Sequence, residues 1–196
     1  MKPIAIDDFC AVRSLANVTF SPEGTSACFT VSQAKKEKNC YESRLYLLKG
    51  GRVRALTGGG KESSFCYLDE NTGLFAGDRE GEKEPSLTSR FYKIALDGGE
   101  ADLAYTFPIP VSQVFPLKNG DLLVVGSTFP GFEDLYKGDK KLVKAYFDDK
   151  KENEDYEVIS QLPWWWNGGT YTRGAYESLF YYDAKKKSVT RLTDAG

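Results

Sequence analysis

The feature that most constrains the fold of this chain is an internal repeat of short apolar stretches separated by turn residues. An apolar stretch, a polar turn rich in Pro, Asn or Gly, and a second apolar stretch recur at 18–32 (VTFSPEGTSACFTVS), 65–78 (FCYLDENTGLFAGD) and 113–127 (QVFPLKNGDLLVVGS). Phe20, Tyr67 and Phe115 occupy matching places, 47 and then 48 residues apart. A repeat of this length indicates that one supersecondary unit is copied along the chain.

The second half of each unit repeats as well. An aromatic-aliphatic stretch runs into a Gly- or Lys-rich turn and then a last stretch at 43–57, 89–106 and 178–193. Val, Phe, Tyr and Thr are common in these stretches, and these residue types favour strands. The pairs Gly50-Gly51 and Asn119-Gly120 favour tight hairpins, because both residue types tolerate positive φ. Each unit therefore predicts four short strands.

Four-stranded units of about 45 residues are typical of β-propeller blades. We therefore expect an all-β fold, a partial β-propeller of about three four-stranded antiparallel blades at 15–57, 61–107 and 110–193. The third blade is too long, which places an insertion at about 127–172, between its second and third strands. Natural propellers use about four to eight blades. The chain is thus expected to be the N-terminal part of a propeller domain over 1–196, completed by further blades or by another chain.

Helical periodicity is confined to two places. Asp7 is expected to cap a short helix over 8–14, and a second helix is expected to run through 131–147. The charged stretch 148–155 (DDKKENED) predicts a solvated loop. One apolar face of the second helix is expected to pack into the core, with partner binding as the alternative, and comprises Phe132, Leu135, Tyr136, Leu142, Val143 and Tyr146.

The chain has no histidine, which excludes several kinds of site. A Ser-His-Asp or Cys-His arrangement needs an imidazole as general base, and many zinc sites need one as ligand. No G-x-S-x-G motif appears either. The stretch 58–63 (GGGKES) lacks the first Gly and the Ser or Thr of a phosphate loop, and it predicts a flexible turn. No catalytic residue, metal site or cofactor is therefore expected in this chain.

Charge and cysteine content limit the kinds of partner the chain can bind and the cellular compartment in which it is expected. A net charge of −2 with scattered Lys and Arg argues against nucleic acid as a partner. The sequence shows no long apolar run and no signal peptide, so we expect neither a membrane span nor export. The four cysteines form no C-x-x-C pair. Free thiols in a reducing cytoplasm are the expected state.

Several segments, in their order along the chain, resemble a known family. They are IAIDDFCAVRSLANVTFSPEG, FAGDREGE, SRFYKIALDGGEA, LPWWWNGGTYTRG, SLFYYD and TRLT. Their order resembles the N-terminal β-propeller region of serine peptidases of the prolyl-oligopeptidase family, in particular the acylaminoacyl-peptidase and dipeptidyl-peptidase-like branch. The resemblance spans nearly the whole chain.

The resemblance implies a propeller that covers a C-terminal α/β-hydrolase domain, which would carry the Ser, Asp and His and is absent from this chain. It implies a non-catalytic, substrate-gating part of a serine peptidase that acts on short or N-acylated peptides. The implied partners are the rest of the propeller, the hydrolase domain and a short peptide substrate. The alternative is a non-enzymatic propeller scaffold of the TolB or WD-repeat kind. Taken alone, a chain with three blades is expected to self-associate through uncovered faces.

The stretch 163–174 (PWWWNGGTYTRG) holds every Trp of the protein. In an extended segment Trp164 and Trp166 face one way and Trp165 the other. The turn that begins at Asn167 is then expected to reverse the chain. The rings either pack beneath the insertion as an anchor or, with Asn167 or Arg173, face a peptide cavity. Trp164, Trp165, Trp166, Asn167 and Arg173 are therefore the candidates for residues near the substrate.

The charged turn Asp78-Arg79-Glu80 follows the strand of the second unit. We expect ion pairs of small energetic worth at a hairpin tip. The functional alternative is a carboxylate that holds the amino terminus of a peptide.

Overall fold

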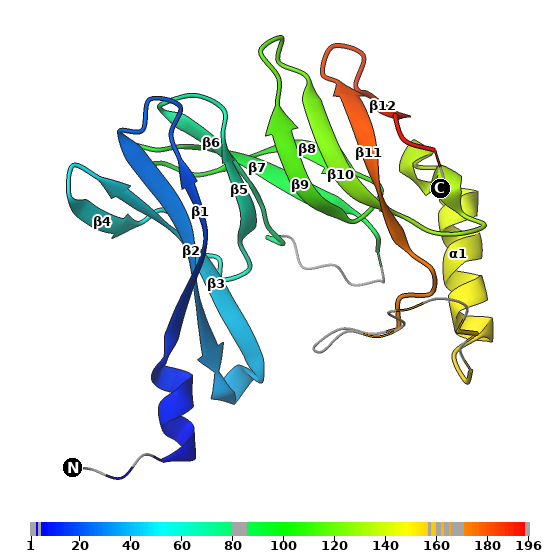
Figure 1. Ribbon diagram of the computed structural model, residues 1–196, viewed down its shortest axis with the longest axis horizontal. Helices are drawn as coiled ribbons and strands as arrows, with labels where there is room; N and C mark the ends of the chain where they lie inside the picture. The colour runs from blue at the N-terminus through cyan, green and yellow to red at the C-terminus, as the bar shows by residue number, and fades with distance from the viewer. Residues whose placement is uncertain are drawn as a thin grey trace. The chain divides into compact units, whose positions relative to one another are not determined.

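The computed structural model describes residues 3, 5–79, 86–156, 158–159, 162, 165 and 171–194. Figure 1 shows the strands, which form three four-stranded antiparallel sheets, each made of four strands that are consecutive in the sequence. The all-β fold with three four-stranded units and a long connection inside the third is therefore confirmed. The blade boundaries within a complete propeller domain stay a prediction.

The first sheet is ordered β1-β2-β3-β4, with β1 at Arg13–Phe20, β2 at Ser26–Lys35, β3 at Cys40–Lys49 and β4 at Arg52–Ala55. The second is ordered β5-β6-β7-β8, with β5 at Ser63–Tyr67, β6 at Thr72–Ala76, β7 at Ser89–Ala95 and β8 at Asp102–Phe107. The third is ordered β12-β11-β10-β9, with β9 at Val111–Pro116, β10 at Leu122–Thr128, β11 at Tyr176–Asp183 and β12 at Ser188–Arg191.

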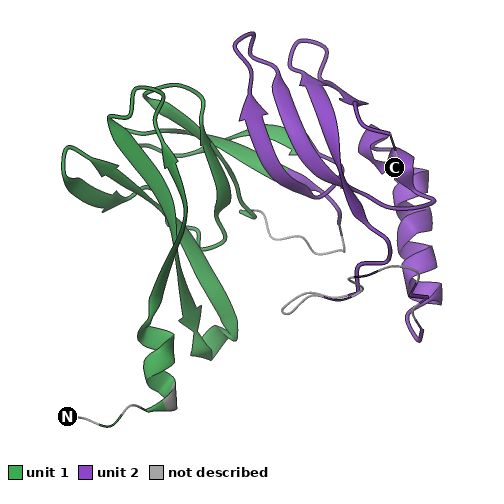
Figure 2. Ribbon diagram, viewed as in Figure 1, with its two compact units in different colours: residues 1–82, 90–106 green, residues 83–89, 107–196 purple. Residues whose placement is uncertain are grey.

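The chain divides into two compact units, shown in green and purple in Figure 2. Unit 1 comprises residues 1–82 and 90–106 and holds the first two sheets, except for the ends of the second. Unit 2 comprises residues 83–89 and 107–196 and holds the third sheet with its long connection.

The core of unit 1 lies between its two sheets. Its buried members are Cys28, Leu45, Leu47, Phe65, Tyr67, Phe75, Tyr92, Ile94 and Leu96. Gly73 on β6 lets the Phe65 ring approach closely, because a Cβ added there would lie 2.2 Å from Cε2 of that ring. The Phe65 ring in turn meets Tyr67 edge-on, with centroids 5.0 Å apart. A side chain at position 73 would therefore displace a packed aromatic pair.

The other face of the first sheet is apolar as well. The strand register places Phe20, Ala27, Leu48 and Val53 in one cross-strand row, on the face opposite Cys28 and Leu47. In this row Phe20 is 68% exposed and Val53 is 57% exposed. A sheet with two apolar faces is typical of an inner layer, which is covered on both sides.

In unit 2, a polar network joins the hairpin β9–β10 to the hairpin β11–β12. The Asp121 carboxylate accepts hydrogen bonds from the Tyr181 hydroxyl and from the Ala184 backbone N–H at 2.9 Å. It also accepts one from the Asn119 side-chain amide. The bond from Tyr181, followed by that from Ala184, holds the pKa of Asp121 below its usual value.

The helical segments differ in their bounds from the expectation. The first is a 3-10 helix, η1 (Ile6–Ala11), so Asp7 lies inside it and does not cap it. The second is split into η3 (Glu133–Lys137) and α1 (Lys140–Glu152). Gly138 separates them, since its φ of 74° is in the left-handed region that ends a helix.

The charged stretch after residue 147 was expected to be a loop, and for residues 148–152 this expectation is wrong. Lys144 and Asp148 form an i,i+4 pair at 3.7 Å. Lys150 and Lys151 occupy the last turn, where cations interact favourably with the helix dipole. These charges allow α1 to continue to Glu152.

Candidate functional site

The connection between β10 and β11 is the longest in the chain and carries η3 and α1, drawn in yellow-green and yellow in Figure 1. Leu135 of η3 is only 1% exposed, and the Tyr136 ring meets Phe180 of β11 at 5.3 Å. These contacts anchor the connection on the third sheet. The Asp139 carboxylate accepts a hydrogen bond from the Lys141 N–H at 2.8 Å and so caps the start of α1.

A cleft of about 990 Å³ lies between the C-terminal half of α1 and the segment that leads into β11. Aromatic rings form part of its walls, and they belong to Phe129, Tyr146, Phe147, Tyr156 and Tyr171. Charged groups of both signs also line it: Lys150, Lys151, Glu154, Asp155 and Arg173. Ligand sites commonly combine aromatic side chains with polar groups that orient the ligand.

Tyr146 is the centre of the aromatic wall. Its ring lies 4.9 Å from that of Phe129, 5.4 Å from that of Phe132 and 5.4 Å from that of Phe147, between centroids. Burial raises the pKa of the Tyr146 hydroxyl, and the positive charge of Arg173 opposes this shift. The Tyr146 hydroxyl is therefore a neutral hydrogen-bonding group in the cleft at neutral pH.

Arg173 connects the segment before β11 to the end of α1. Its backbone is in the left-handed region, with φ of 49°, and Gly174 follows with φ of 70°. The guanidinium Nη2 donates to the carbonyl of Asn153 at 3.5 Å, and Asn153 is the C-cap of α1. A cation is favourable at a helix C-terminus. Tyr156 also contacts this cap, because its hydroxyl donates to Asn153 Oδ1 at 2.5 Å.

The predicted residues near the substrate are only partly described. Arg173 lines the cleft, whereas Trp165 is not among its described lining residues. Trp165 forms an antiparallel bridge with Tyr171, which does line the cleft, and the turn expected from Asn167 lies outside the described residues. Trp165 is 47% exposed and Tyr171 is 46% exposed. Trp164, Trp166 and Asn167 lie outside the described residues, and their roles stay predictions.

The sequence placed Tyr146 on a helix face expected to pack into the core, with partner binding as the alternative, and did not single out Phe129, Tyr156 or Tyr171. These residues come from three separate parts of the connection and meet only in the folded chain. The one signal in the sequence was the density of aromatic residues within the insertion.

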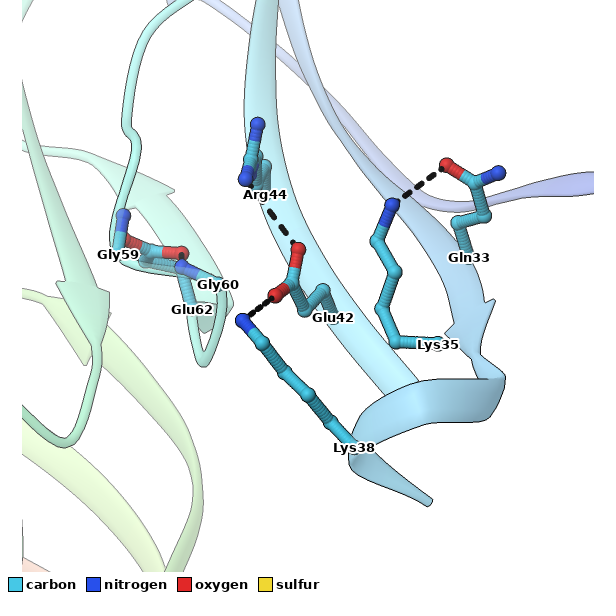
Figure 3. A network of polar contacts seen from close by, with 8 residues as sticks. All are labelled: Gln33, Lys35, Lys38, Glu42, Arg44, Gly59, Gly60 and Glu62. Carbon is cyan, nitrogen blue, oxygen red and sulfur yellow. Dashed lines mark hydrogen bonds and ion pairs between the residues drawn. The ribbon is translucent and has the colours of Figure 1, made fainter. Parts of the chain in front are cut away.

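A polar network lies at the end of the first sheet where β2 turns into β3 (Figure 3). Lys38 Nζ donates to Glu42 Oε1 at 2.7 Å and thereby lowers the pKa of Glu42. Arg44 contacts the other Glu42 oxygen at 3.3 Å, and Lys35 donates to the side chain of Gln33 at 3.3 Å. Each cation of this network already has an acceptor, so the network holds the hairpin together.

The Gly-rich stretch 58–63 beside this network was expected to be a flexible turn. In the structure it is a turn held by hydrogen bonds. Glu62 is 2% exposed, and its two carboxylate oxygens accept the N–H groups of Gly59 at 2.8 Å and Gly60 at 2.7 Å (Figure 3). The Ser43 N–H donates to the Gly60 carbonyl at 2.8 Å. Glu62, which stands where a phosphate-loop motif has Ser or Thr, therefore accepts the backbone N–H groups that a phosphate would otherwise need.

In the charged turn after β6, one residue forms the expected ion pair and another packs on the core instead. Asp78 pairs with Lys61 at 2.6 Å, as expected for an exposed ion pair. Arg79, in contrast, lies over the rings of Phe75 and Tyr92, at 5.4 and 5.2 Å from their centroids. Arg79 thus covers one end of the unit 1 core, and Glu80 lies outside the described residues.

The described residues hold neither a metal-binding cluster nor a membrane-spanning helix. No group of three or more Cys, Asp or Glu side chains is arranged to hold a metal ion. No helix in this part of the chain is long and apolar enough to cross a membrane.

Comparison with solved structures defines the class of fold. The chain superposes on an acylaminoacyl peptidase of Pyrococcus horikoshii with a TM-score of 0.61 and 15% identity, over 94% of this chain and 26% of that one. It superposes on the β-propeller domain of the trilobed protease of Pyrococcus furiosus with a TM-score of 0.52 and 11% identity, over 94% of this chain and 44% of that one. The fold is therefore that of part of a β-propeller.

Comparison of sequences gives a more particular match. No protein-family model matches the chain. It is 29% identical over 199 residues to the uncharacterized peptidase YuxL of Bacillus subtilis (strain 168), and the match covers 98% of this chain and 28% of that protein. The similarity to the propeller region of a peptidase, which the sequence motifs indicate, is confirmed. The chain spans little more than a quarter of the relative's length.

Proposed function

We propose that this chain is the N-terminal portion of the propeller of a serine peptidase and restricts access of short or N-acylated peptides to the catalytic domain. The observation that carries this proposal is the similarity to a peptidase along 98% of the chain. The chain itself performs no chemistry in this proposal, because its sequence offers no imidazole and no nucleophile motif. Its partners are the further blades, the hydrolase domain and a peptide substrate.

The long connection supports a role at the substrate. Loops on a rigid scaffold are where binding residues concentrate, and this connection carries the aromatic cleft and Arg173. Peptides offer apolar side chains and charged ends, which the aromatic walls and the lysine and acidic groups of the cleft suit. The four free thiols support a reducing compartment, and we propose the cytoplasm.

Kinetics on two proteins test the proposal. The purified chain is expected to leave N-acetyl-alanine p-nitroanilide unhydrolysed. A product translated through the codons after residue 196 is expected to cleave it, to react with a fluorophosphonate, and to prefer short peptides over long ones. An extended product that lacks Ser, His and Asp in a hydrolase domain would contradict the proposal and leave a non-enzymatic propeller scaffold.

A variant of the extended product tests the cleft separately. Tyr171→Ala is expected to raise KM for peptides and to leave kcat unchanged, since a contact in the cleft would bind the substrate equally in the ground state and in the transition state. Tyr41→Ala, at a tyrosine of the first sheet that is 76% exposed and lies outside the cleft, is the matched control and is expected to change neither constant. Equal effects of the two variants would remove the cleft from the proposal and leave the peptidase assignment intact.

A further inference from the structure

A second groove, of about 500 Å³, lies beside the N-terminal half of α1. The apolar side chains that line it belong to Leu87, Pro108, Val143 and Phe147. Lys140 and Lys144, both exposed, also line it, one helical turn apart on α1. Phe147 also contributes to the aromatic cleft, but the two lysines belong to this groove alone among the described lining residues.

Local backbone structure shapes the groove. Gly138 has φ of 74°, and a Cβ added there would lie 3.6 Å from the Pro108 ring. The proline ring therefore packs directly against the turn before α1. On the other wall, the Thr88 N–H donates to Ser86 Oγ at 3.0 Å and holds the short segment that precedes β7. The groove is thus built from three separate segments of unit 2.

The groove has a one-sided charge. Its described lining residues include two lysines and no carboxylate. Lys144 contacts Asp148 at 3.7 Å, but the two side chains are 79% and 61% exposed, where such a pair contributes little. An occupant should therefore bring negative charge as well as apolar surface.

We propose that this groove docks an acidic peptide segment of a partner protein. An apolar side chain of that segment enters the groove, and flanking Asp or Glu residues meet Lys140 and Lys144. The volume lies within the range of about 300 to 1,000 Å³ that is usual for ligand pockets. Charge complementarity of this kind sets partner choice and raises the association rate. The proposal is independent of the peptidase assignment.

Fluorescence anisotropy with the whole chain tests the proposal. The probe is a fluorescein-labelled peptide, acetyl-Glu-Asp-Leu-Phe-Asp-Glu-amide. The pair of substitutions Lys140→Glu and Lys144→Glu is expected to raise the Kd at least about tenfold, since two attractive charges become repulsive. The control pair Lys118→Glu and Lys141→Glu changes the net charge equally at exposed sites outside the groove, and it is expected to change the Kd less than about twofold. Circular dichroism confirms that each variant is folded.

A second probe, with Ser-Ser in place of Leu-Phe, is expected to bind at least about tenfold more weakly. Equal weakening by both pairs of substitutions would show unspecific charge attraction and overturn the proposal. No binding at millimolar peptide would overturn it too. Self-association of the wild type that only the groove variants abolish would assign the groove to a second copy of the chain instead.

Discussion

Replacement of Gly73 by Ala is expected to destabilise unit 1, because the new Cβ would collide with a packed ring. It would lie 2.2 Å from Cε2 and 2.4 Å from Cζ of Phe65, well inside van der Waals contact. The Phe65 ring is buried and paired with Tyr67, so it cannot move without loss. Overpacking of this kind costs about 1–3 kcal/mol, and a disturbed aromatic pair adds about 0.5–1.5 kcal/mol.

One effect acts in the opposite direction. Alanine restricts the unfolded chain more than glycine and so stabilises the fold by about 0.4–1 kcal/mol. The net expectation is a loss of about 2 kcal/mol in the free energy of unfolding, measured by urea denaturation with far-UV circular dichroism. Gly58→Ala is the matched control, since no atom lies within 4 Å of its added Cβ, and it is expected to cause no loss.

A double-mutant cycle isolates the collision. Phe65→Leu removes the ring atoms that the new Cβ would meet, so Gly73→Ala is expected to be neutral or slightly stabilising in that background. The coupling free energy between the two sites should then be about 2 kcal/mol, within the usual range for contacting residues. A coupling below about 0.5 kcal/mol would refute the reasoning, because Gly73→Ala would then act without the ring.

Three further predictions concern other parts of the molecule. Glu62→Ala leaves the N–H groups beneath it without their acceptor and is expected to lower stability by about 2–4 kcal/mol in thermal denaturation; an unchanged Tm would show that water replaces the carboxylate. The hydrogen bond from Tyr181 is the main cause of the lowered pKa of Asp121. The ionised Asp121 therefore contributes fully to the free energy of unfolding above its unfolded-state pKa of about 3.9, and this contribution is lost as the pH falls through the lower pKa of the folded state. The difference in free energy of unfolding between the wild type and Asp121→Asn should therefore become smaller as the pH falls below about 4. A difference that stays constant with pH would contradict this expectation. The chain alone is expected to self-associate, as measured by light scattering, and to do so less after Phe20→Glu and Val53→Glu. A monodisperse wild-type monomer that binds no hydrophobic dye would show that the apolar row of the first sheet needs no covering surface.

Much of the fold was predictable because strand pairing here is local. Strand residues and turn residues alternate over short distances, and the Gly50-Gly51 hairpin has positive φ at both positions as expected. Burial was less predictable. The matching positions of the repeat, Phe20, Tyr67 and Phe115, are 68%, 8% and 48% exposed. Their exposure depends on whether another sheet covers them, which the local pattern does not encode.

The candidate site was predictable only as a region. An overlong third unit indicated an insertion at about 127–172, and Arg173, just after it, does line the cleft. Which aromatic residues gather around Tyr146 depends on how η3 and α1 pack on the third sheet. The stacking of Arg79 on two core rings is likewise a product of tertiary packing. In the sequence Arg79 stands between two acidic residues, and nothing there indicates that it packs on aromatic rings.

The connection between β10 and β11 also has a consequence for the order of folding. The first sheet pairs strands joined by short turns, so its ladder closes small loops and can form as soon as β4 leaves the ribosome. In the third sheet, Thr128 must find Tyr176 across the whole connection before β10 and β11 pair. Closing that longer loop costs more entropy, and residues with larger sequence separation pair more slowly. We therefore expect amide hydrogens of β2 and β3 to gain protection during refolding before those of β10 and β11.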